Sequence, residues 1–451
     1  MPSGLRSDQK LTPEMRRAVF AGCIGFAVDF FDIYLPILAL APVIRYFEPK
    51  GLSSSATTTI YFFTFAATLF GRPCGAVLFG HYADRIGRRR TTMISIAGFG
   101  ALTFLIACLP GYASLGVWAL VLLVVLRFVD GVFMGGEYTS NNTLALEMVP
   151  KDRRGFVGGV LQGAFPIGFA MVSAVTSFMF WATTKQQYYA WGWRVTFIFG
   201  ALMAFAFLLY YRTVPESPMW EAAEKSESPL KEVFSGHHLR NLGQVFLMML
   251  GFWTASQCAS ILPGIMIQHL HLTPELTSTA FLIGSVLLFF GFVGVGLLSQ
   301  VIGRRPTIVL CGAAVLVAGT FLYYALVHHA LVGGSVAGTM LLVIAFDVLV
   351  VSPWGVVTTY ISERFPTHVR ASGYGIGYSA AVVIPAFAGF YLLGLSHFMP
   401  YEFTPMVLLL LAGGLMMAGG LLGPETRDVE LHLPDLGRSG ESVAAGPLPA
   451  E

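Results

Sequence analysis

Long apolar runs separated by short polar segments recur along the whole chain. Each run is close to the ~20 residues that an α-helix needs to cross the hydrocarbon core of a bilayer. The runs number twelve and lie at 18–44, 58–80, 91–110, 116–145, 155–181, 191–212, 242–268, 278–300, 307–328, 335–361, 371–398 and 402–423. This pattern predicts an all-α integral membrane protein with twelve transmembrane helices.

The composition also favours a membrane protein over a soluble one. Hydrophobic residues make up 55% of the 451 residues and charged residues only 12%, whereas a soluble domain carries about 25% charged residues. The formal net charge of +2 does not indicate a nucleic-acid partner, because the charges lie in loops rather than on one face.

No group of residues has the spacing of a catalytic or metal site. The five cysteines are scattered in or beside apolar runs, which is typical of small core residues rather than of a disulfide framework or metal ligands. The sequence shows neither a glycine-rich phosphate loop nor a nucleophile triad. We therefore expect no enzymatic activity, no metal and no tightly bound cofactor.

Two charged loops repeat each other at an offset of 216 residues. Ile-Gly-Arg-Arg at 86–89 recurs at 302–305, and Gly80 corresponds to Gly296. The same offset relates Glu147, Pro150 and Arg154 to Glu363, Pro366 and Arg370. Two loops in register predict two pseudo-symmetric six-helix bundles.

The predicted organisation has five parts. They are a cytoplasmic N-tail (1–17), an N-terminal bundle (18–212), a charged cytoplasmic linker (213–241), a C-terminal bundle (242–423) and a cytoplasmic C-tail (424–451). Most of the 27 Lys and Arg residues fall on the side of the tails and the linker, which predicts that both termini are cytoplasmic. The polar N-terminal segment lacks the pattern of a signal peptide.

The loop after the second run is predicted to be a gate at the membrane surface. Its glycines let helix ends approach closely, and Asp84 can bond to helix-end amides or to a neighbouring arginine. The second loop has Gln300 where the first has Asp84, so we expect an asymmetric gate. The residues assigned to the gate are Gly80, Asp84, Arg85, Gly87, Arg88 and Arg154.

Ionisable residues within the apolar runs are the candidates for the chemistry, since each costs ~2.5–3.5 kcal/mol or more at membrane depth unless it is paired. Asp29 and Asp32 share a face of the first helix. Five acids at depth oppose only two arginines, so some acids should be protonated when they do not face water. The residues predicted to carry the coupled proton are Asp29, Asp32, Asp130 and Glu137.

Arg127 is predicted to anchor a substrate carboxylate, because its planar fork binds one bidentately and keeps its charge. It lies about as far from the start of its helix as Asp29 does, so the two residues are expected at one level of the membrane. Alternatives stay open: Asp29 and Asp32 could pair with Arg127 as a structural lock, and Glu137 could pair with the gate. Arg72 is expected to lock the second helix against a neighbour, whereas Asp347 has no partner identifiable from the sequence.

Further polar and aromatic residues fall at the depth of a central cavity. The candidates for substrate contact are Tyr34, Gln162, Trp253, Gln257, Trp354 and Tyr378. Packing is the alternative for the aromatic ones. Pro166 and Pro385 lie in the fifth and eleventh runs, which the repeat makes equivalent, and should loosen both helices as rocking motions require.

The whole chain resembles the major facilitator superfamily, whose signature after the second helix matches Gly80–Arg89. Several stretches are similar to the metabolite–proton symporter family. They are Gly71–Gly75, Phe79–Arg88, Arg127–Tyr138, Arg153–Phe156, Trp191–Arg194 and Pro215–Pro218. Asp29-Phe-Phe-Asp32 departs from that family, which tends to have Glu at the first position, and also resembles aromatic-acid and sialate symporters.

The resemblance implies a secondary transporter of the bacterial inner membrane that works by alternating access. We expect a monomeric proton-coupled symporter that imports a small organic anion such as a mono- or dicarboxylate. Uptake of an aromatic acid or of a zwitterion such as a betaine is the alternative. A transporter-like sensor or an uncoupled exporter would be a different class, and would not need protonatable residues in the pathway. The expected partners are therefore the anion, protons and the lipid bilayer.

Overall fold

The computed structural model describes residues 11–49, 51–52 and 54–431. The outer parts of the predicted tails lie outside these residues. All regular structure in the described chain is helical, and twelve helices are long and apolar enough to cross a membrane. The predicted fold class is therefore confirmed.

The first group of helices follows the first six apolar runs. Its long helices are α1 (Pro13–Leu35), α2 (Ser54–Ile86), α3 (Arg88–Cys108), α5 (Val117–Glu147), α6 (Lys151–Gln162), α7 (Ala164–Ala182) and α9 (Trp193–Tyr211). Short turns of helix join them: a π-turn at Pro36–Leu40, a 3₁₀ turn at Ala41–Tyr46, α4 (Tyr112–Leu115), α8 (Lys185–Gln187) and a π-turn at Tyr188–Gly192.

A linker with two short helices, α10 (Pro218–Ala222) and α11 (Pro229–Val233), leads to the second group. The long helices of that group are α12 (Gly236–Gln268), α13 (Pro274–Ile302), α14 (Arg304–Ala314), α15 (Thr320–Leu331), α16 (Val336–Val351), α17 (Trp354–Glu363), α18 (Arg370–Ser379), α19 (Ala388–Leu395) and α20 (Pro405–Leu422). A π-turn joins α14 to α15 at Val315–Gly319, and 3₁₀ turns lie at Thr367–Val369, Ala380–Val383, Pro385–Phe387 and Tyr401–Phe403.

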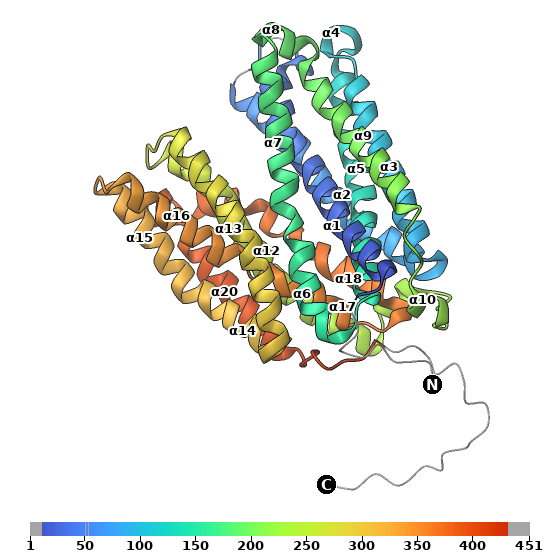
Figure 1. Cartoon of the computed structure of the whole chain (residues 1–451). Coiled ribbons are helices and arrows are strands. Elements are labelled where there is room, and N and C mark those ends of the chain that lie inside the picture. The colour runs from blue at the N-terminus through green and yellow to red at the C-terminus, as the bar shows by residue number, and fades with distance from the viewer. Residues whose placement is uncertain (1–10, 50, 53, 432–451) are drawn as a thin grey trace, which may run out of the picture.

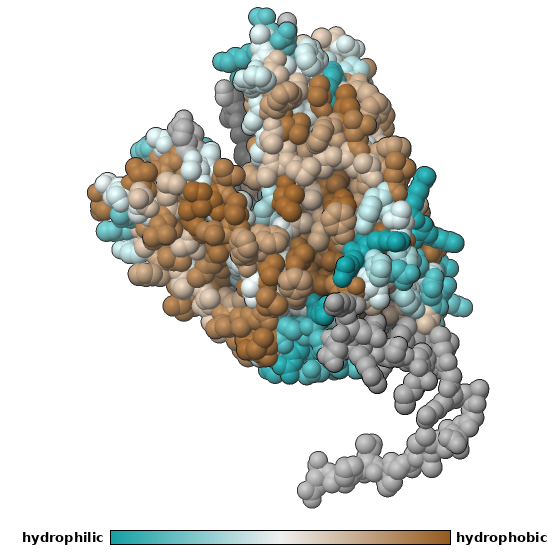
Figure 2. Space-filling view, viewed as in Figure 1, coloured by the Kyte–Doolittle hydropathy of each residue, from teal (hydrophilic) through white to brown (hydrophobic). Residues whose placement is uncertain are grey.

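The two groups meet at one end of the molecule and diverge at the other (Figure 1). We call the first the linker end, since it contains α10, the start of α1 and the segment after α20, and the second the open end. The space-filling view shows a notch between the groups at the open end, and apolar side chains covering their flanks (Figure 2). Apolar flanks suit contact with lipid tails.

Glycines allow α2 and α5 to pack with their backbones almost in contact. A Cβ atom at Gly75 would overlap the carbonyl oxygen of Val132, and one at Gly131 would overlap that of Thr68. Small residues at such crossings let helices associate in a membrane, where no hydrophobic effect drives them together. This contact holds Arg72 of α2 and Arg127 of α5 near the middle of the first group.

The fifth and eleventh spans are both interrupted, as the prolines predicted. The fifth is divided at Gly163 into α6 and α7, and the eleventh changes to 3₁₀ turns before and after Ile384. Pro263, in contrast, lies within a continuous α12, so proline alone does not break a helix here. A break in the hydrogen-bond ladder allows a helix to bend, and here it occurs in equivalent spans of the two groups.

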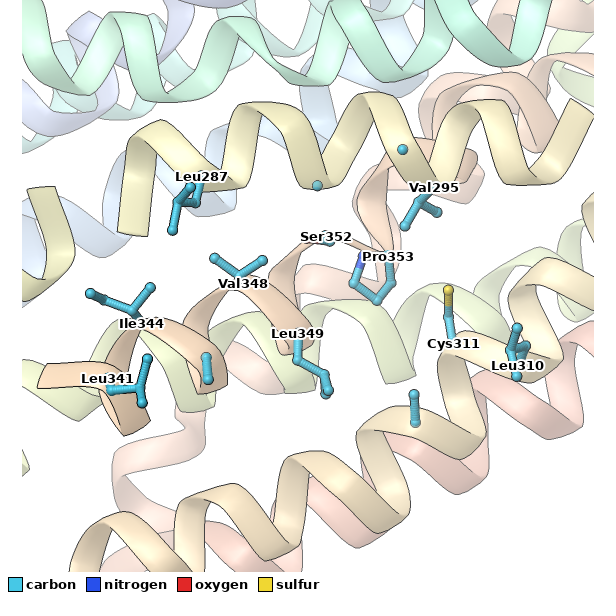
Figure 3. A pocket seen from close by; sticks show the side chains of 14 residues that line it. Leu287, Val295, Leu310, Cys311, Leu341, Ile344, Val348, Leu349, Ser352 and Pro353 are labelled. Carbon is cyan, nitrogen blue, oxygen red and sulfur yellow. The ribbon is translucent and has the colours of Figure 1, made fainter. Parts of the chain in front are cut away.

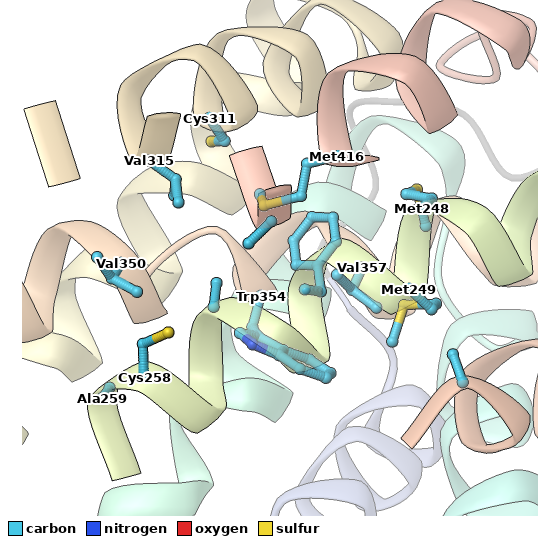
Figure 4. Close-up of a cluster of buried hydrophobic side chains, with 14 of the residues drawn as sticks. Met248, Met249, Cys258, Ala259, Cys311, Val315, Val350, Trp354, Val357 and Met416 are labelled. Carbon is cyan, nitrogen blue, oxygen red and sulfur yellow. The ribbon is translucent and has the colours of Figure 1, made fainter. Parts of the chain in front are cut away.

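A large buried core fills the second group of helices (Figure 4). Met248, Met249, Trp354, Val357 and Met416 are among its members. Cys258 and Cys311 are buried, as expected of small core residues, whereas Cys74 and Cys108 are exposed on the flanks of their helices. The cysteines are free among the described residues.

An apolar groove of about 660 Å³ lies between α13, α14 and α16 (Figure 3). Leu287, Val295, Leu341 and Ile344 are among the side chains that line it, and Ser352 is its only polar side chain. None of the paired acids and arginines lines this groove. It therefore lacks the charged groups that a polar substrate needs.

Candidate functional site

Arg127 lies at the centre of a buried triad. Its Nη1 atom is 3.2 Å from Oδ2 of Asp32 and 3.0 Å from Oδ2 of Asp130, and its Nη2 donates to the carbonyl oxygen of Asp32. Thr103 donates a further hydrogen bond to Oδ1 of Asp32 at 2.8 Å. All these side chains are buried, so one guanidinium cation is held between two carboxylates away from water.

Arg72 and Asp29 form a second buried pair. Nη2 of Arg72 is 3.2 Å from Oδ2 of Asp29, and the guanidinium lies over the ring of Tyr138 at 4.8 Å. Of the two pairings with Arg127 that the sequence left open, the one with Asp32 is present, whereas Asp29 binds Arg72 instead. Two residues that share one helix face thus bind two different helices: Asp29 contacts α2, and Asp32 contacts α5.

Glu137 is buried beside α1, near the Arg72–Asp29 pair but without an ion pair of its own among the described residues. Its Oε1 accepts a hydrogen bond from Nδ2 of Asn141 at 2.7 Å, and it packs where a side chain on Gly25 would lie. Its Oε2 has no hydrogen-bond partner among the described residues. Pairing of Glu137 with the gate does not occur here. A buried carboxyl with one open oxygen is suited to hold a proton.

The central cluster contains more acid than base. Arg72 and Arg127 oppose five buried acids: Asp29, Asp32, Asp130, Glu137 and Asp347. Asp347 of α16 makes no ion pair within the described part of the chain. Burying an unpaired charge is far more costly than burying a neutral carboxyl, so a fully ionised cluster would be unstable.

Aromatic residues from both groups of helices meet next to Arg72. The ring of Tyr138 is 5.0 Å from that of Tyr378, which packs against Trp253 and Trp354 at 5.7 and 5.5 Å. The indole of Trp253 donates to the carbonyl oxygen of Tyr378, and that of Trp354 donates to Oγ of Ser256. Three of the predicted contact residues, Trp253, Trp354 and Tyr378, therefore form one cluster.

Of the other three predicted contact residues, Gln162 lies against the side chain of Tyr378, whereas Tyr34 and Gln257 lie apart from this cluster. Tyr34 packs against Phe165 and Phe169 of α7, with ring centroids 6.3 and 4.8 Å apart. Gln162 is buried at the end of α6, and its amide nitrogen has no partner among the described residues. Gln257 is half-buried on α12 and makes no hydrogen bond within the part of the chain that the structure describes.

At the linker end, Arg88 joins the two groups of helices. Its guanidinium contacts Asp84 at 3.0 Å and Glu147 at 3.3 Å, and it donates to the carbonyl oxygen of Thr367 at 2.6 Å. Glu147 also binds Arg370 of α18 at 2.6 Å. Two arginines and two acids thus form a neutral, buried network between the groups.

Asp84 caps a helix of the opposite group. Its carboxylate accepts hydrogen bonds from the backbone N–H groups of Ala371 and Ser372 and from Oγ of Ser372, at 3.1, 2.9 and 2.7 Å. A carboxylate at the start of α18 also interacts favourably with the helix dipole. Gly80 allows this approach, since a Cβ there would lie 2.9 Å from Cα of Ser372.

The second loop makes the equivalent contact with a different side chain. Gln300 accepts a hydrogen bond from the N–H group of Gly155 at 3.0 Å and donates to the carbonyl oxygen of Lys151 at 3.2 Å. It therefore binds the start of α6 as Asp84 binds the start of α18. The structure agrees with the expected asymmetry, since one contact is charged and the other neutral.

Arg154 and Arg85 differ in their contacts. Arg154 is buried and bridges the groups, because its Nη1 donates to the carbonyl oxygen of Val429 at 2.9 Å and lies 3.8 Å from Glu363. Arg85, in contrast, is exposed and makes no ion pair with the described residues. The closure of the linker end thus depends on Arg154 rather than on Arg85.

Two acids that the sequence analysis did not assign to the gate complete it. Glu216 accepts hydrogen bonds from the N–H groups of Arg88 and Arg89, and Glu425 accepts them from those of Arg304 and Arg305. Gly87 and Gly303 precede these helices with φ of 110° and 104°. The signal was present in the sequence, as Pro-Glu-Ser at 215–217 recurs as Pro-Glu-Thr at 424–426.

Burial raises the pKa of the Glu216 carboxyl above its ordinary value, although the N–H groups of Ser217 and Arg89 and the charge of Arg88 oppose the rise. A carboxylate that caps two N–H groups at a helix start is stabilised by the helix dipole.

The geometry defines a membrane transport protein: two groups of helices, closed at one end, surround buried acids and arginines at mid-depth. The profile of the Major Facilitator Superfamily matches residues 22–390. The chain belongs to this superfamily and is of the metabolite–proton symporter type. The relatives found are transporters rather than enzymes.

The named relatives cover most of the chain. An inner membrane metabolite transport protein of Escherichia coli, YhjE, is 31% identical over 85% of this chain and 88% of its own length. The shikimate transporter of the same bacterium is 29% identical over 89% and 93%. A proline/betaine transporter of Salmonella typhimurium is 26% identical over 82% and 76%.

Solved structures agree on the fold. The proton:xylose symporter XylE bound to 6-bromo-6-deoxy-D-glucose superimposes with a TM-score of 0.76 at 19% identity, over 92% of this chain and 97% of that one. The inward open conformation of XylE gives a TM-score of 0.64 at 20% identity, over 92% and 98%.

Proposed function

We propose that this protein is a proton-coupled symporter that imports a small organic anion, either a mono- or a dicarboxylate, by alternating access. The observation that carries the proposal is the triad in which Arg127 is held between Asp32 and Asp130. When both carboxylates are ionised, the triad has a net charge of −1, because two negative charges face one guanidinium cation. A proton that binds to one of the two carboxylates removes this excess negative charge.

Protonation and substrate binding are coupled by this excess. When Asp32 or Asp130 takes a proton, it no longer holds Arg127 as an ion pair, and the guanidinium can bind a substrate carboxylate instead. Without the proton, the substrate would add a third negative charge to the same cation. Proton and anion therefore favour each other's binding, as symport requires.

Arg72 supplies a second cation for the same site. Only its Nη2 atom is used by Asp29, and Tyr138 lies beneath its guanidinium. A dicarboxylate could reach both arginines, whereas a monocarboxylate would need one. Glu137, with its open oxygen, is a further proton carrier on α5.

The proposed orientation of the protein in the membrane rests on the distribution of its positively charged residues. Lys and Arg residues are concentrated at the linker end, so we propose that this end is cytoplasmic and that the open end faces the periplasm. The protein would then reside in the bacterial inner membrane with both termini inside, as a monomer. The closed linker end and the notch at the open end together correspond to an outward-facing state (Figure 2).

A zwitterion is the second candidate substrate, and the aromatic cluster favours it. Trp253, Trp354, Tyr378 and Tyr138 form faces on which a quaternary ammonium group can lie. Shikimate, proline and betaine, after which relatives are named, all have a carboxylate group. A betaine would place its carboxylate at an arginine and its cation against these rings.

Uptake into proteoliposomes tests the proposal. Purified protein is reconstituted, an inward proton gradient is imposed, and labelled pools of mono- and dicarboxylates, aromatic acids and betaines are offered separately. We expect accumulation of a carboxylate that disappears when a protonophore collapses the gradient. Accumulation that ignores the gradient would contradict proton coupling, and accumulation of a betaine alone would favour the second candidate.

A further inference from the structure

Three potential metal ligands meet at the linker end, outside the central cluster. Glu232 belongs to α11, His238 to the first turn of α12, and His368 to the 3₁₀ turn before α18. Oε1 of Glu232 is 2.7 Å from Nε2 of His368 and 3.9 Å from Nε2 of His238. Each side chain is about a quarter to a third exposed, so the group can be reached from the surface.

These residue types and this spacing suit a transition-metal ion. Zn²⁺ binds imidazole nitrogen and carboxylate oxygen at about 2.0–2.2 Å, in tetrahedral sites that often keep one position for water. Ligand atoms of such a tetrahedron lie roughly 3.4 Å apart. The three ligand atoms here lie within 4.8 Å of one another, so small side-chain rotations are enough to form the site.

We propose that Glu232, His238 and His368 bind one divalent transition-metal ion such as Zn²⁺, with water as the fourth ligand. Glu232 and His238 lie on two different helices, and His368 is more than a hundred residues further along the chain, which is why the sequence predicted no metal site. The fold brings them together because α11 packs between α12 and the turn that leads into α18. Mg²⁺ should bind poorly, since it prefers an octahedral shell of oxygen ligands.

The location connects this site to the gate. His368 follows Thr367, whose carbonyl oxygen accepts a hydrogen bond from Arg88, and it precedes Arg370, which pairs with Glu147. An ion held by His368, Glu232 and His238 would fix this turn to the linker and to α12. It would therefore stabilise the arrangement in which the linker end is closed.

Binding of ZnCl₂ to the full-length purified protein, measured by isothermal titration calorimetry after removal of metals with EDTA, tests the site. We expect one ion per chain, and binding weakened ~10-fold or more in His238→Ala and in His368→Ala. His237→Ala is the matched control, since His237 is an exposed neighbour of His238 and should leave the affinity unchanged. Equal binding by all four proteins would overturn the proposal.

Cobalt gives a readout that does not depend on the variants folding. Co²⁺ added to the wild-type protein should show the intense visible absorption of a tetrahedral site, and Zn²⁺ should abolish it. A weak, water-like octahedral spectrum would rule the site out. The effect on transport rests on the proposed function: Zn²⁺ should slow uptake by the wild type but not by His368→Ala, whereas the binding results stand or fall independently of any transport.

Discussion

Arg127 is the single residue on which the proposed coupling depends most, because it contacts two acids and the backbone of α1. Arg127→Lys keeps the charge but cannot donate in two directions from a planar fork. Losing a hydrogen bond to a charged group costs about 1.5–3 kcal/mol, so we expect initial uptake to fall roughly ten- to hundredfold while the protein still reaches the membrane.

Initial rates in proteoliposomes with matched protein content measure this effect. Arg85→Lys serves as the control, because Arg85 is exposed and should tolerate the change. Normal uptake by Arg127→Lys would remove Arg127 from the substrate site and leave it a structural lock.

The members of the central cluster could be predicted at the scale of residues, but the sequence left open which acid pairs with which arginine. Charges inside apolar runs are visible in the sequence, and counting residues gives their depth. The direction in which each helix face points depends on packing, such as the close contact of α2 with α5 at Gly75 and Gly131. This is why Asp32, rather than Asp29, meets Arg127.

At the scale of helices, the α2–α5 contact should be the least tolerant of added volume. Gly75→Ala would place a Cβ against the carbonyl oxygen of Val132, which only a backbone shift can relieve. Overpacking typically costs about 1–3 kcal/mol. We expect a clearly lower melting temperature in detergent for Gly75→Ala.

Gly414→Ala is the matched control, since a Cβ on this glycine of α20 would point into open space, with no neighbouring side chain or helix within 4 Å. Its melting temperature should stay the same or rise slightly, because Ala favours a helix. Equal melting temperatures for the two variants would show that α2 and α5 are not in close contact.

The contact of Asp84 with α18 should control which end of the molecule is open. Asp84→Asn removes the charge that binds Arg88 and the start of α18. A loss of ~1.4 kcal/mol changes a two-state ratio tenfold, so the linker end should open more often. Spin labels at Ser114 and Val332, which lie at the open ends of the two groups, should then report shorter distances by electron paramagnetic resonance.

Asp428→Asn provides the control, because Asp428 is an exposed acid at the same end whose pair with Arg427 is also exposed. Its distance distribution should match the wild type. An unchanged distribution in Asp84→Asn would mean that the Asp84 contact does not hold the linker end closed.

Most helices could be predicted from hydrophobic runs, because membrane spans need both length and apolarity. The π-turn after Leu35 and the break at Gly163 could not be placed, since both depend on local backbone geometry. The caps by Glu216 and Glu425 were missed for a different reason. They are 209 residues apart rather than 216, so a comparison at one fixed offset does not pair them.

At the scale of the whole molecule, the closed linker end and the buried acids act together in the proposed transport cycle. Hydrogen bonds and ion pairs of Asp84, Arg88, Glu147 and Arg154 join the two groups at the linker end, while the groups diverge at the open end (Figure 1). Binding of proton and anion at mid-depth would neutralise the centre, and the groups could then close around it and separate at the linker end.

Substrate and proton are proposed to cross the membrane together, and one measurement tests this coupling most directly. A gradient of the identified substrate alone, without a pH gradient, is imposed on proteoliposomes that contain a pH-sensitive dye. We expect the lumen to acidify as the substrate enters, and Asp32→Asn to reduce this acidification strongly. Entry of the substrate into wild-type proteoliposomes with no change of internal pH would contradict the account.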